Sequence, residues 1–401
     1  MLRFLTGGES HGPALSVIVE GLPAGLSITV EQIQGELSRR RLGYGRGPRM
    51  RFEKDEVSLL GGVRHGRTLG SPVVVEIRNT EWPKWVEEMS AAPGVPSKVL
   101  TAPRPGHADL AGMQKYGFAD ARDVLERASA RETAARVAAG CLAKALLAEI
   151  GVSVISHVVA LGTVAAPGSR RPAPEDLDTV DESPVRCFDA ATGEEMIVAI
   201  KAAMKDGDSL GGVAEVLAYG VPVGLGSHVH WDRKLDGLLA QAVMSIQAVK
   251  AVEIGDAFAT SGERGSTAHD PVFYDTEADS YFRTTSRAGG IEGGISTGGL
   301  LALKAVMKPL ATLNRPVLQT VDTATKEPTV SFKERTDATA VPAMGVVAET
   351  MAALVLASES LRKFGGDSVS ELVRNRDAYL AALGDPVSAV GDANSGRDAD
   401  G

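Results

Sequence analysis

Aromatic residues are scarce in this chain of 401 residues, at 4%, and cysteine occurs only twice. Cys141 and Cys187 could form at most one disulfide, so a disulfide-stapled scaffold is excluded and a reducing cytoplasm is the expected compartment. The chain has no unbroken run of about 18 apolar residues. Its N-terminus also lacks the basic and apolar segments of a signal peptide, so we expect no association with a membrane.

Positive charge is also in deficit, because 42 Lys and Arg face 51 Asp and Glu, which gives a net charge of −9. An acidic chain repels nucleic acid and anionic lipid, so neither is an expected partner. Any anionic ligand must therefore be held by a local cluster of cations.

Several common motifs are missing from the sequence. There is no Walker phosphate loop, no G-x-G-x-x-G after a strand, no H-E-x-x-H and no paired C-x-x-C. No spacing is typical of a Ser-His-Asp hydrolase either. These absences argue against the usual nucleotide-binding, zinc-dependent and hydrolase classes, and we expect no metal.

Helices and strands are predicted in an irregular order. Capping boxes at Thr29 and Ser129 each predict the start of a helix, an apolar stripe predicts another over residues 235–249, and Pro342 begins a long helix that ends at glycines 365–366. β-Branched runs predict strands at residues 16–20, 73–77, 152–159 and 328–333. Without regular βαβ alternation, this order favours an α+β fold.

The chain is expected to form one domain over residues 1–384, followed by a disordered acidic tail over 385–401. One internal echo exists between GLPAGL at 21–26 and GVPVGL at 220–225. Each follows a strand-like run and precedes an amphipathic helix. A duplicated half and two chance turns both explain it.

Six arginines and no acid fall within residues 39–51, at the end of the first predicted helix and in a glycine-rich loop. Cations at the negative end of a helix dipole would explain Arg39 to Arg41 but not the later ones. The alternative is a cradle for phosphate and carboxylate groups, which guanidinium binds through two parallel hydrogen bonds.

Two histidines lie in glycine-containing turns. His11 lies within GESHG at residues 8–12, and His107 lies within RPGHAD at 104–109. A lone histidine is more often structural, but one in a turn near arginines is a candidate for acid–base catalysis. Ser129, preceded by Arg127, could be a plain helix cap or part of an anion site at a helix N-terminus.

Eight segments, in order, resemble the chorismate synthase family as far as about residue 370. They are GESHG (8–12), the arginine loop (40–49), RPGHAD (104–109), RASARET (127–133), VEIGD (252–256), AGG (288–290), MKP (307–309) and AVPA (340–343). Residues 79–85, NTEWPKW, resemble the actinobacterial branch.

The resemblance implies an α+β fold with helices between two antiparallel sheets, and a homotetramer. It implies a lyase that converts 5-enolpyruvylshikimate 3-phosphate to chorismate by 1,4-anti elimination of phosphate. Reduced FMN would be required without net redox change. Because the sequence has no nicotinamide-binding fingerprint, we expect reduced FMN to come from outside, with an external flavin reductase as a candidate partner.

The resemblance also assigns site residues. The substrate would contact Ser10, Arg40, Arg46, Arg49 and Arg131, of which the family also associates Arg40 and Arg46 with NADPH. The flavin would contact Arg127, Ala128, Ser129, Gln247, Ala248, Gly293, Lys308, Pro309, Leu310, Ala311, Thr312 and Arg335. His11 would be the general acid toward phosphate, His107 would protonate or hydrogen-bond the reduced flavin, and Asp337 would act as a base near flavin N5.

The chain departs from the family pattern at four positions. Ala251 and Ala257 stand where glycine is usual, and a backbone with positive φ there would make alanine costly. Ser286 and Ala311 replace the usual Asn and Ser. Two other classes remain alternatives: a non-catalytic phosphometabolite-binding protein, and an FMN oxidoreductase that consumes NADPH.

Overall fold

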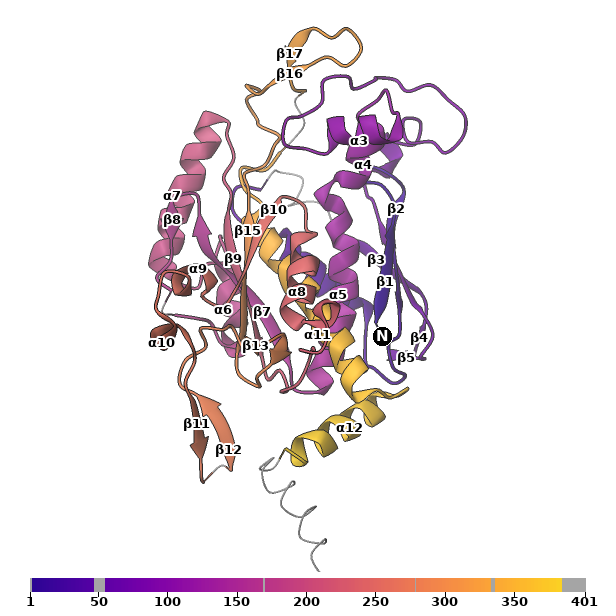
Figure 1. The fold of residues 1–401 in the computed structure, drawn as a ribbon. Coiled ribbons are helices and arrows are strands. Elements are labelled where there is room, and N and C mark those ends of the chain that lie inside the picture. The colour runs from indigo at the N-terminus through magenta and orange to yellow at the C-terminus, as the bar shows by residue number, and fades with distance from the viewer. Residues whose placement is uncertain (1, 47–54, 169, 278, 333–335, 384–401) are drawn as a thin grey trace, which may run out of the picture.

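Two antiparallel sheets enclose a layer of helices in this computed structural model, which describes residues 2–46, 55–168, 170–277, 279–332 and 336–383 (Figure 1). The four-stranded sheet has the order β1-β2-β6-β3 and the five-stranded sheet the order β10-β15-β9-β7-β8. Every pairing in both sheets is antiparallel. The arrangement confirms the predicted α+β sandwich.

The first sheet consists of β1 (Arg3–Gly7), β2 (Ala14–Glu20), β3 (Glu56–Gly61) and β6 (Val73–Arg78). The second consists of β7 (Ser153–Leu161), β8 (Val164–Ala165), β9 (Gly212–Tyr219), β10 (Val249–Ile254) and β15 (Leu301–Met307). Four two-stranded pairs are β4 (Val63–Arg64) with β5 (Arg67–Thr68), β11 (Val272–Asp275) with β12 (Ser280–Arg283), β13 (Ile291–Glu292) with β14 (Ile295–Ser296), and β16 (Gln319–Val321) with β17 (Pro328–Val330).

The helices between the sheets are α1 (Val30–Arg41), α5 (Thr133–Glu149), α8 (Leu235–Met244) and α11 (Val341–Phe364). The remaining α-helices are α3 (Asp109–Tyr116), α4 (Arg122–Ala128), α6 (Leu177–Glu182), α7 (Ala190–Asp206), α9 (Ala257–Thr260), α10 (Gly265–Ala268) and α12 (Val369–Ala381). Short 3₁₀ turns are η1 (Trp82–Lys84), η2 (Ala130–Glu132), η3 (Pro174–Asp176) and η4 (Trp231–Arg233).

Helix α11 is the centre of the sandwich. It packs against α5, α8, β7 and β9. Its length and hydropathy alone would allow it to cross a membrane, but 89% of its most apolar window is buried inside the protein. A helix that is apolar on all sides and enclosed by other elements is a core helix.

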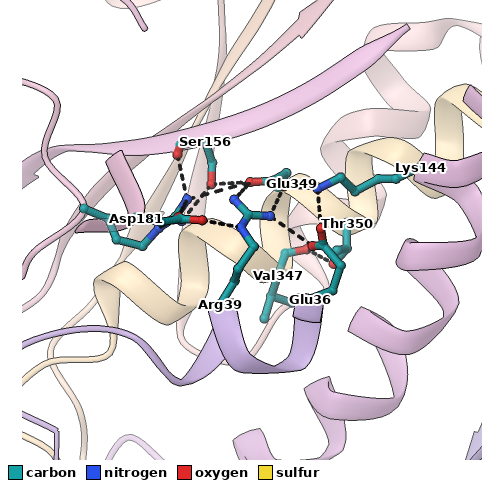
Figure 2. A network of polar contacts seen from close by, with 9 residues as sticks. Glu36, Arg39, Lys144, Ser156, Asp181, Val347, Glu349 and Thr350 are labelled. Carbon is teal, nitrogen blue, oxygen red and sulfur yellow. Dashed lines mark hydrogen bonds and ion pairs between the residues drawn. The ribbon is translucent and has the colours of Figure 1, made fainter. Parts of the chain in front are cut away.

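A buried ionic network joins α11 to its neighbours (Figure 2). Glu349, on α11, has a fully buried side chain and pairs with Arg39 of α1, whose Nη1 lies 2.6 Å away, and with Lys144 of α5. Ser156 of β7 donates to the same carboxylate at 2.9 Å, and Asp181 pairs with the Nε of Arg39 at 2.6 Å. Burial raises the pKa of Glu349, but the charges of Arg39 and Lys144 outweigh it and hold that pKa well below its usual value. The network therefore fixes the arginine-bearing end of α1.

The two predicted capping boxes have different outcomes. At Thr29 the box is present and begins α1. At Ser129 the prediction is wrong, because the Ser129 hydroxyl accepts from the backbone of Arg131 in η2 and α5 begins only at Thr133. The Glu132 carboxylate does not return to the cap, since it pairs with the guanidinium of Arg136 at 2.8 Å, a stronger partner than an amide.

The predicted strands at 16–20 and 73–77 are confirmed within β2 and β6, and the one at 152–159 is confirmed from residue 153, where β7 begins. Of the run 328–333, residues 328–330 form β17 and residue 333 lies outside the described residues. The expected tail over 385–401 also lies outside them, and the domain boundary at 384 stays a prediction.

The echoed turns at 21–26 and 220–225 are built alike. In the first turn, the Thr68 hydroxyl accepts from the backbone N–H of the last leucine at 2.9 Å and donates to the proline carbonyl at 2.6 Å. In the second, the Ser296 hydroxyl makes the same two bonds, at 2.8 and 2.6 Å. Matching bonds from distant parts of the chain favour a duplicated unit over chance.

Candidate active site

The predicted substrate-binding arginines meet at the end of α1. Arg40 is buried in the last turn of the helix, with Nη1 3.5 Å from Thr133 Oγ1. Arg46 donates to the Arg40 carbonyl at 3.4 Å, and its Nε lies 2.7 Å from Asp337 Oδ2. Three predicted site residues are thus in one cluster, while Arg49 lies outside the described residues.

Arg131 extends this cluster toward the His11 loop. Its Nη1 lies 2.6 Å from Asp55 Oδ1, and its Nε donates to Asn79 Oδ1 at 3.0 Å. The Asn79 amide in turn donates to the Gly12 carbonyl at 2.7 Å. Arg131 is therefore tied, through one side chain, to the loop that connects β1 and β2 and carries His11.

His11 is held by residues that the sequence analysis missed. Its Nδ1 lies 2.9 Å from Glu126 Oε1, and its backbone N–H donates to Glu126 Oε2 at 2.9 Å. The Trp85 ring lies against the imidazole, with 4.0 Å between ring centroids. Ser10, beside it, is buried and donates through its backbone N–H to the Glu126 carbonyl. No local pattern could reveal Glu126, because it is 115 residues away and sits in an ordinary charged helix.

Burial alone would raise the pKa of Glu126. The hydrogen bonds from His11 and the nearby charge of Arg122 lower this pKa by more than burial raises it. The net pKa is below its usual value, so Glu126 is an anion at neutral pH.

His107 also has its Nδ1 on a buried carboxylate, that of Asp109. Arg104 pairs with the same carboxylate at 2.8 Å and donates to Thr312 Oγ1 at 3.1 Å. Lys308 donates to the carbonyl of the residue before His107. Burial raises the pKa of Asp109, yet its bonds to His107 and Arg104 bring it well below its usual value. The segment predicted to contact flavin therefore lies against the His107 loop.

A second group of predicted cofactor residues lies around a hollow of about 360 Å³, whose lining includes Arg127, Glu132 and Gln247. Arg127 donates to two backbone carbonyls beside the His11 loop, at 2.9 and 3.0 Å. Gln247 donates to Glu132 at 3.2 Å, and the carbonyl of Ala248 accepts from the Lys308 backbone at 3.0 Å. Residues 247–248 therefore connect the hollow to the 308–312 segment.

The donors and acceptors of this region fit a flavin mononucleotide. Gln247 Oε1 is buried and has no hydrogen-bond partner among the described residues. It could therefore accept a hydrogen bond from a ring N–H or a ribityl hydroxyl of the flavin. Arg127 and Lys308 supply positive charge for a phosphate or an anionic ring. Ala128 ends α4 and Ser129 caps the next turn, beside Arg127.

Among the described residues, the predicted flavin contact Gly293 is not brought together with these. Gly293 lies in the turn between β13 and β14, which precedes the start of β15. Lys308 directly follows the other end of β15. Arg335 lies outside the described residues. The assignment of Gly293 and Arg335 to the flavin stays a prediction.

The four departures cause no strain in the described backbone. Ala251 and Ala257 are not among the described residues with positive φ, so alanine has no penalty at either position. The Ser286 hydroxyl accepts from Arg171 at 3.4 Å, and Ala311 lies beside Gly106.

An α+β sandwich that gathers arginines and two carboxylate-bound histidines defines an enzyme that acts on an anion by acid–base chemistry. A family model described as chorismate synthase matches residues 2–361. The chain belongs to the chorismate synthase family, and is therefore an enzyme of the lyase class.

Similar proteins agree over nearly the whole chain. The chorismate synthase of Thermobifida fusca (strain YX) is 58% identical over 96% of this chain and 99% of its own. That of Micrococcus luteus is also 58% identical, over 96% of this chain and 95% of its own. A solved structure titled "Crystal Structure of Chorismate Synthase" superposes with a TM-score of 0.77 at 39% identity, covering 95% of this chain and 97% of that one. Neither a phosphometabolite-binding protein nor an NADPH-consuming oxidoreductase is favoured.

Proposed function

We propose that this protein converts 5-enolpyruvylshikimate 3-phosphate to chorismate, with reduced FMN bound in the region of Arg127, Gln247 and Lys308. The observation that carries the proposal is a chain of contacts. Arg46 donates to the Arg40 carbonyl, Arg40 contacts Thr133 two residues after Arg131, and Arg131 is joined through Asn79 to the loop of His11. The family membership supports the same reaction.

The substrate carries two carboxylates and a phosphate, and guanidinium groups bind all three well. Arg40, Arg46 and Arg131 would neutralise this charge, with Ser10 beside them and Arg49 as a further predicted contact. In a chain with a net charge of −9, such a cluster is what allows an anion to bind.

The elimination breaks the C–O bond to phosphate, removes the proton from C6 and forms a new ring double bond, so no net oxidation occurs. His11 would donate a proton to the departing phosphate. Asp337, paired with Arg46, would act as the base near flavin N5 and would take up the proton that leaves C6. His107, fixed by Asp109, would hydrogen-bond the reduced flavin.

Reduced FMN, when bound, supplies electron density to the allylic system. Gln247 would accept a hydrogen bond from it, and Arg127 and Lys308 would balance its charge. The main chain of residues 308–312, with Ala248 and the Ala128–Ser129 turn, would line the rest of the site. An external flavin reductase would supply the reduced form.

We further propose a homotetramer that works in the cytoplasm. The β11–β12 hairpin extends away from the sandwich (Figure 1) and exposes two aromatic pairs, Phe273 with Phe282 and Tyr274 with Tyr281. Exposed apolar patches of this kind are typical of subunit contacts. Light scattering coupled to size-exclusion chromatography tests the assembly, and a monomer would contradict it.

The reaction is tested anaerobically with purified protein and substrate. We expect phosphate and chorismate to form in equal amounts when reduced FMN is added, and none without it. NADPH consumed in proportion to product would instead indicate an oxidoreductase, and binding without turnover would indicate a sensor. Either result would contradict the proposal.

A further inference from the structure

Glu126 is placed to control which nitrogen of His11 carries the proton. Both carboxylate oxygens lie near Nδ1 of His11, at 2.9 and 3.1 Å, and one also accepts the backbone N–H of the same residue. A carboxylate only accepts, so Nδ1 must carry the hydrogen. The second ring nitrogen, Nε2, makes no hydrogen bond to any residue that the structure describes.

Two further side chains hold this pair in place. Trp85, which follows η1, covers one face of the imidazole at 4.0 Å between ring centroids. Arg122 donates to Glu126 at 3.0 Å, and its guanidinium lies 5.0 Å from the centre of the Trp85 ring. Glu126, four residues further along α4, is therefore kept charged and the imidazole is kept from rotating.

The same arrangement occurs a second time in the chain. His107 has Nδ1 on Asp109, Asp109 pairs with Arg104, and Arg104 lies 5.0 Å from the centre of the Phe332 ring. Each histidine that the proposed function uses thus has a buried carboxylate, an arginine and an aromatic ring behind it. The side chains of Glu126 and Asp109 are 3% and 0% exposed.

We propose that Glu126 is a positioning residue for His11. It accepts from Nδ1–H throughout, so the proton given to the departing phosphate comes from Nε2–H of the doubly protonated ring, and the neutral ring left behind is the Nδ1–H tautomer. The tautomer of a histidine is set by the hydrogen bond that its other nitrogen makes. The inference rests on the proposed function, because it assigns Glu126 an effect only through His11.

The test is a double-mutant cycle with Glu126→Ala, His11→Ala and the two combined, assayed anaerobically with reduced FMN. Glu126→Ala is expected to lower kcat by about 10²- to 10³-fold with KM nearly unchanged, because a misplaced acid affects the transition state more than binding. In the His11→Ala background the same change is expected to lower kcat by less than about threefold, since residues that act as one unit are not additive.

Glu126→Gln is the conservative variant. Its carbonyl oxygen can still accept from Nδ1–H and from the backbone, so kcat is expected to stay within about tenfold of wild type. If Glu126→Ala fails to fold, the cycle is run with Glu126→Gln, whose smaller loss must also vanish in the His11→Ala background.

Glu88→Ala is the matched control. Glu88 pairs with the other side of Arg122, at 3.7 Å, but does not reach His11, so kcat should be unchanged. If the kcat losses of Glu126→Ala and His11→Ala multiply in the double variant, the positioning role of Glu126 is overturned, while the role of His11 as the acid stands. Full activity of His11→Ala would overturn both this role and the proposed role of His11 as the acid.

Discussion

Arg46 and Asp337 form an ion pair, with 2.7 Å between Nε and Oδ2, although 291 positions separate them in the sequence. The backbones beside them are joined as well, because the Ala338 N–H donates to the Gly45 carbonyl at 2.9 Å. The guanidinium proposed to bind the substrate therefore already has an anion in contact with it. An incoming substrate anion would compete with Asp337 for that guanidinium, which links substrate binding to the charge on the proposed base.

Asp337→Asn separates these two effects. We expect kcat to fall by about 10²- to 10⁴-fold, as for loss of an acid–base group. KM for the substrate should stay equal or decrease, since Arg46 then has one competing anion fewer. Steady-state kinetics with saturating reduced FMN measures both. Asp232→Asn, at an exposed pair with His230, is the control; a wild-type kcat in Asp337→Asn would rule out the base.

Gln247→Leu should weaken flavin binding. Its buried Oε1 has no partner among the described residues, so we expect the cofactor to supply one. Loss of that hydrogen bond should raise the dissociation constant of FMN about tenfold, or about 1.4 kcal/mol. Fluorescence titration in the presence of substrate measures it. Gln241→Leu, at an exposed position on α8 shortly before the turn that carries Gln247, is the control and should have no effect.

Glu349→Gln should destabilise the fold. Removing one partner of a buried ion pair costs about 3–5 kcal/mol, because the remaining charges are left uncompensated. Urea unfolding at one fixed protein concentration measures the change in unfolding free energy. Glu292→Gln, at the half-exposed pair with Arg283, should cost less than about 1 kcal/mol.

The comparison of wild type with Glu349→Gln also predicts how the stability depends on pH. The pKa of Glu349 is lower in the folded state than its unfolded value of 4.5, so its stabilising effect is complete above that pH and declines as the pH falls below it. The stability gap between wild type and Glu349→Gln should therefore narrow in acid. A gap that is equal at pH 3 and pH 7 would contradict the assigned charge state.

Ala248→Gly should stabilise the protein. Ala248 has φ of 65°, in the left-handed region that penalises a side chain, so glycine should gain about 0.5–1 kcal/mol. Thermal unfolding without flavin measures it. Ala251→Gly, in β10 and without positive φ, is the matched control and should destabilise by a similar amount. A loss at Ala248 would show that its methyl group packs better than its backbone is strained.

Local patterns predicted much of the fold because their causes are local. The capping box at Thr29, the β-branched strands and the proline and glycine that delimit α11 each depend on neighbours within a few residues. The box at Ser129 failed for the opposite reason. Its glutamate pairs with Arg136 four residues later and also accepts from Thr6 and Gln247, and the last two are far away in sequence, where no local window contains them.

In the candidate site too, residues with a local sequence signal could be predicted, and residues defined by distant partners could not. His11 and His107 could be found because glycine-containing turns mark them, and Asp109 lies within the same short segment as His107. Glu126 could not, since a glutamate in a charged helix is usually solvated. Arg39 is one of the six clustered arginines, for which helix capping and anion binding were both open. Its carboxylate partner Glu349 lies 310 residues later and makes it part of the core.

The enclosure of α11 also affects how the chain can fold as it is made. Residues 341–364 are the last part of the sandwich to be synthesised, and until they emerge the surfaces of β7 and β9 that pack on α11 stay exposed. Nascent chains would expose that apolar surface to other molecules, a hazard for any large single-core protein. A chain shortened before residue 364 should therefore be recovered mainly as aggregate.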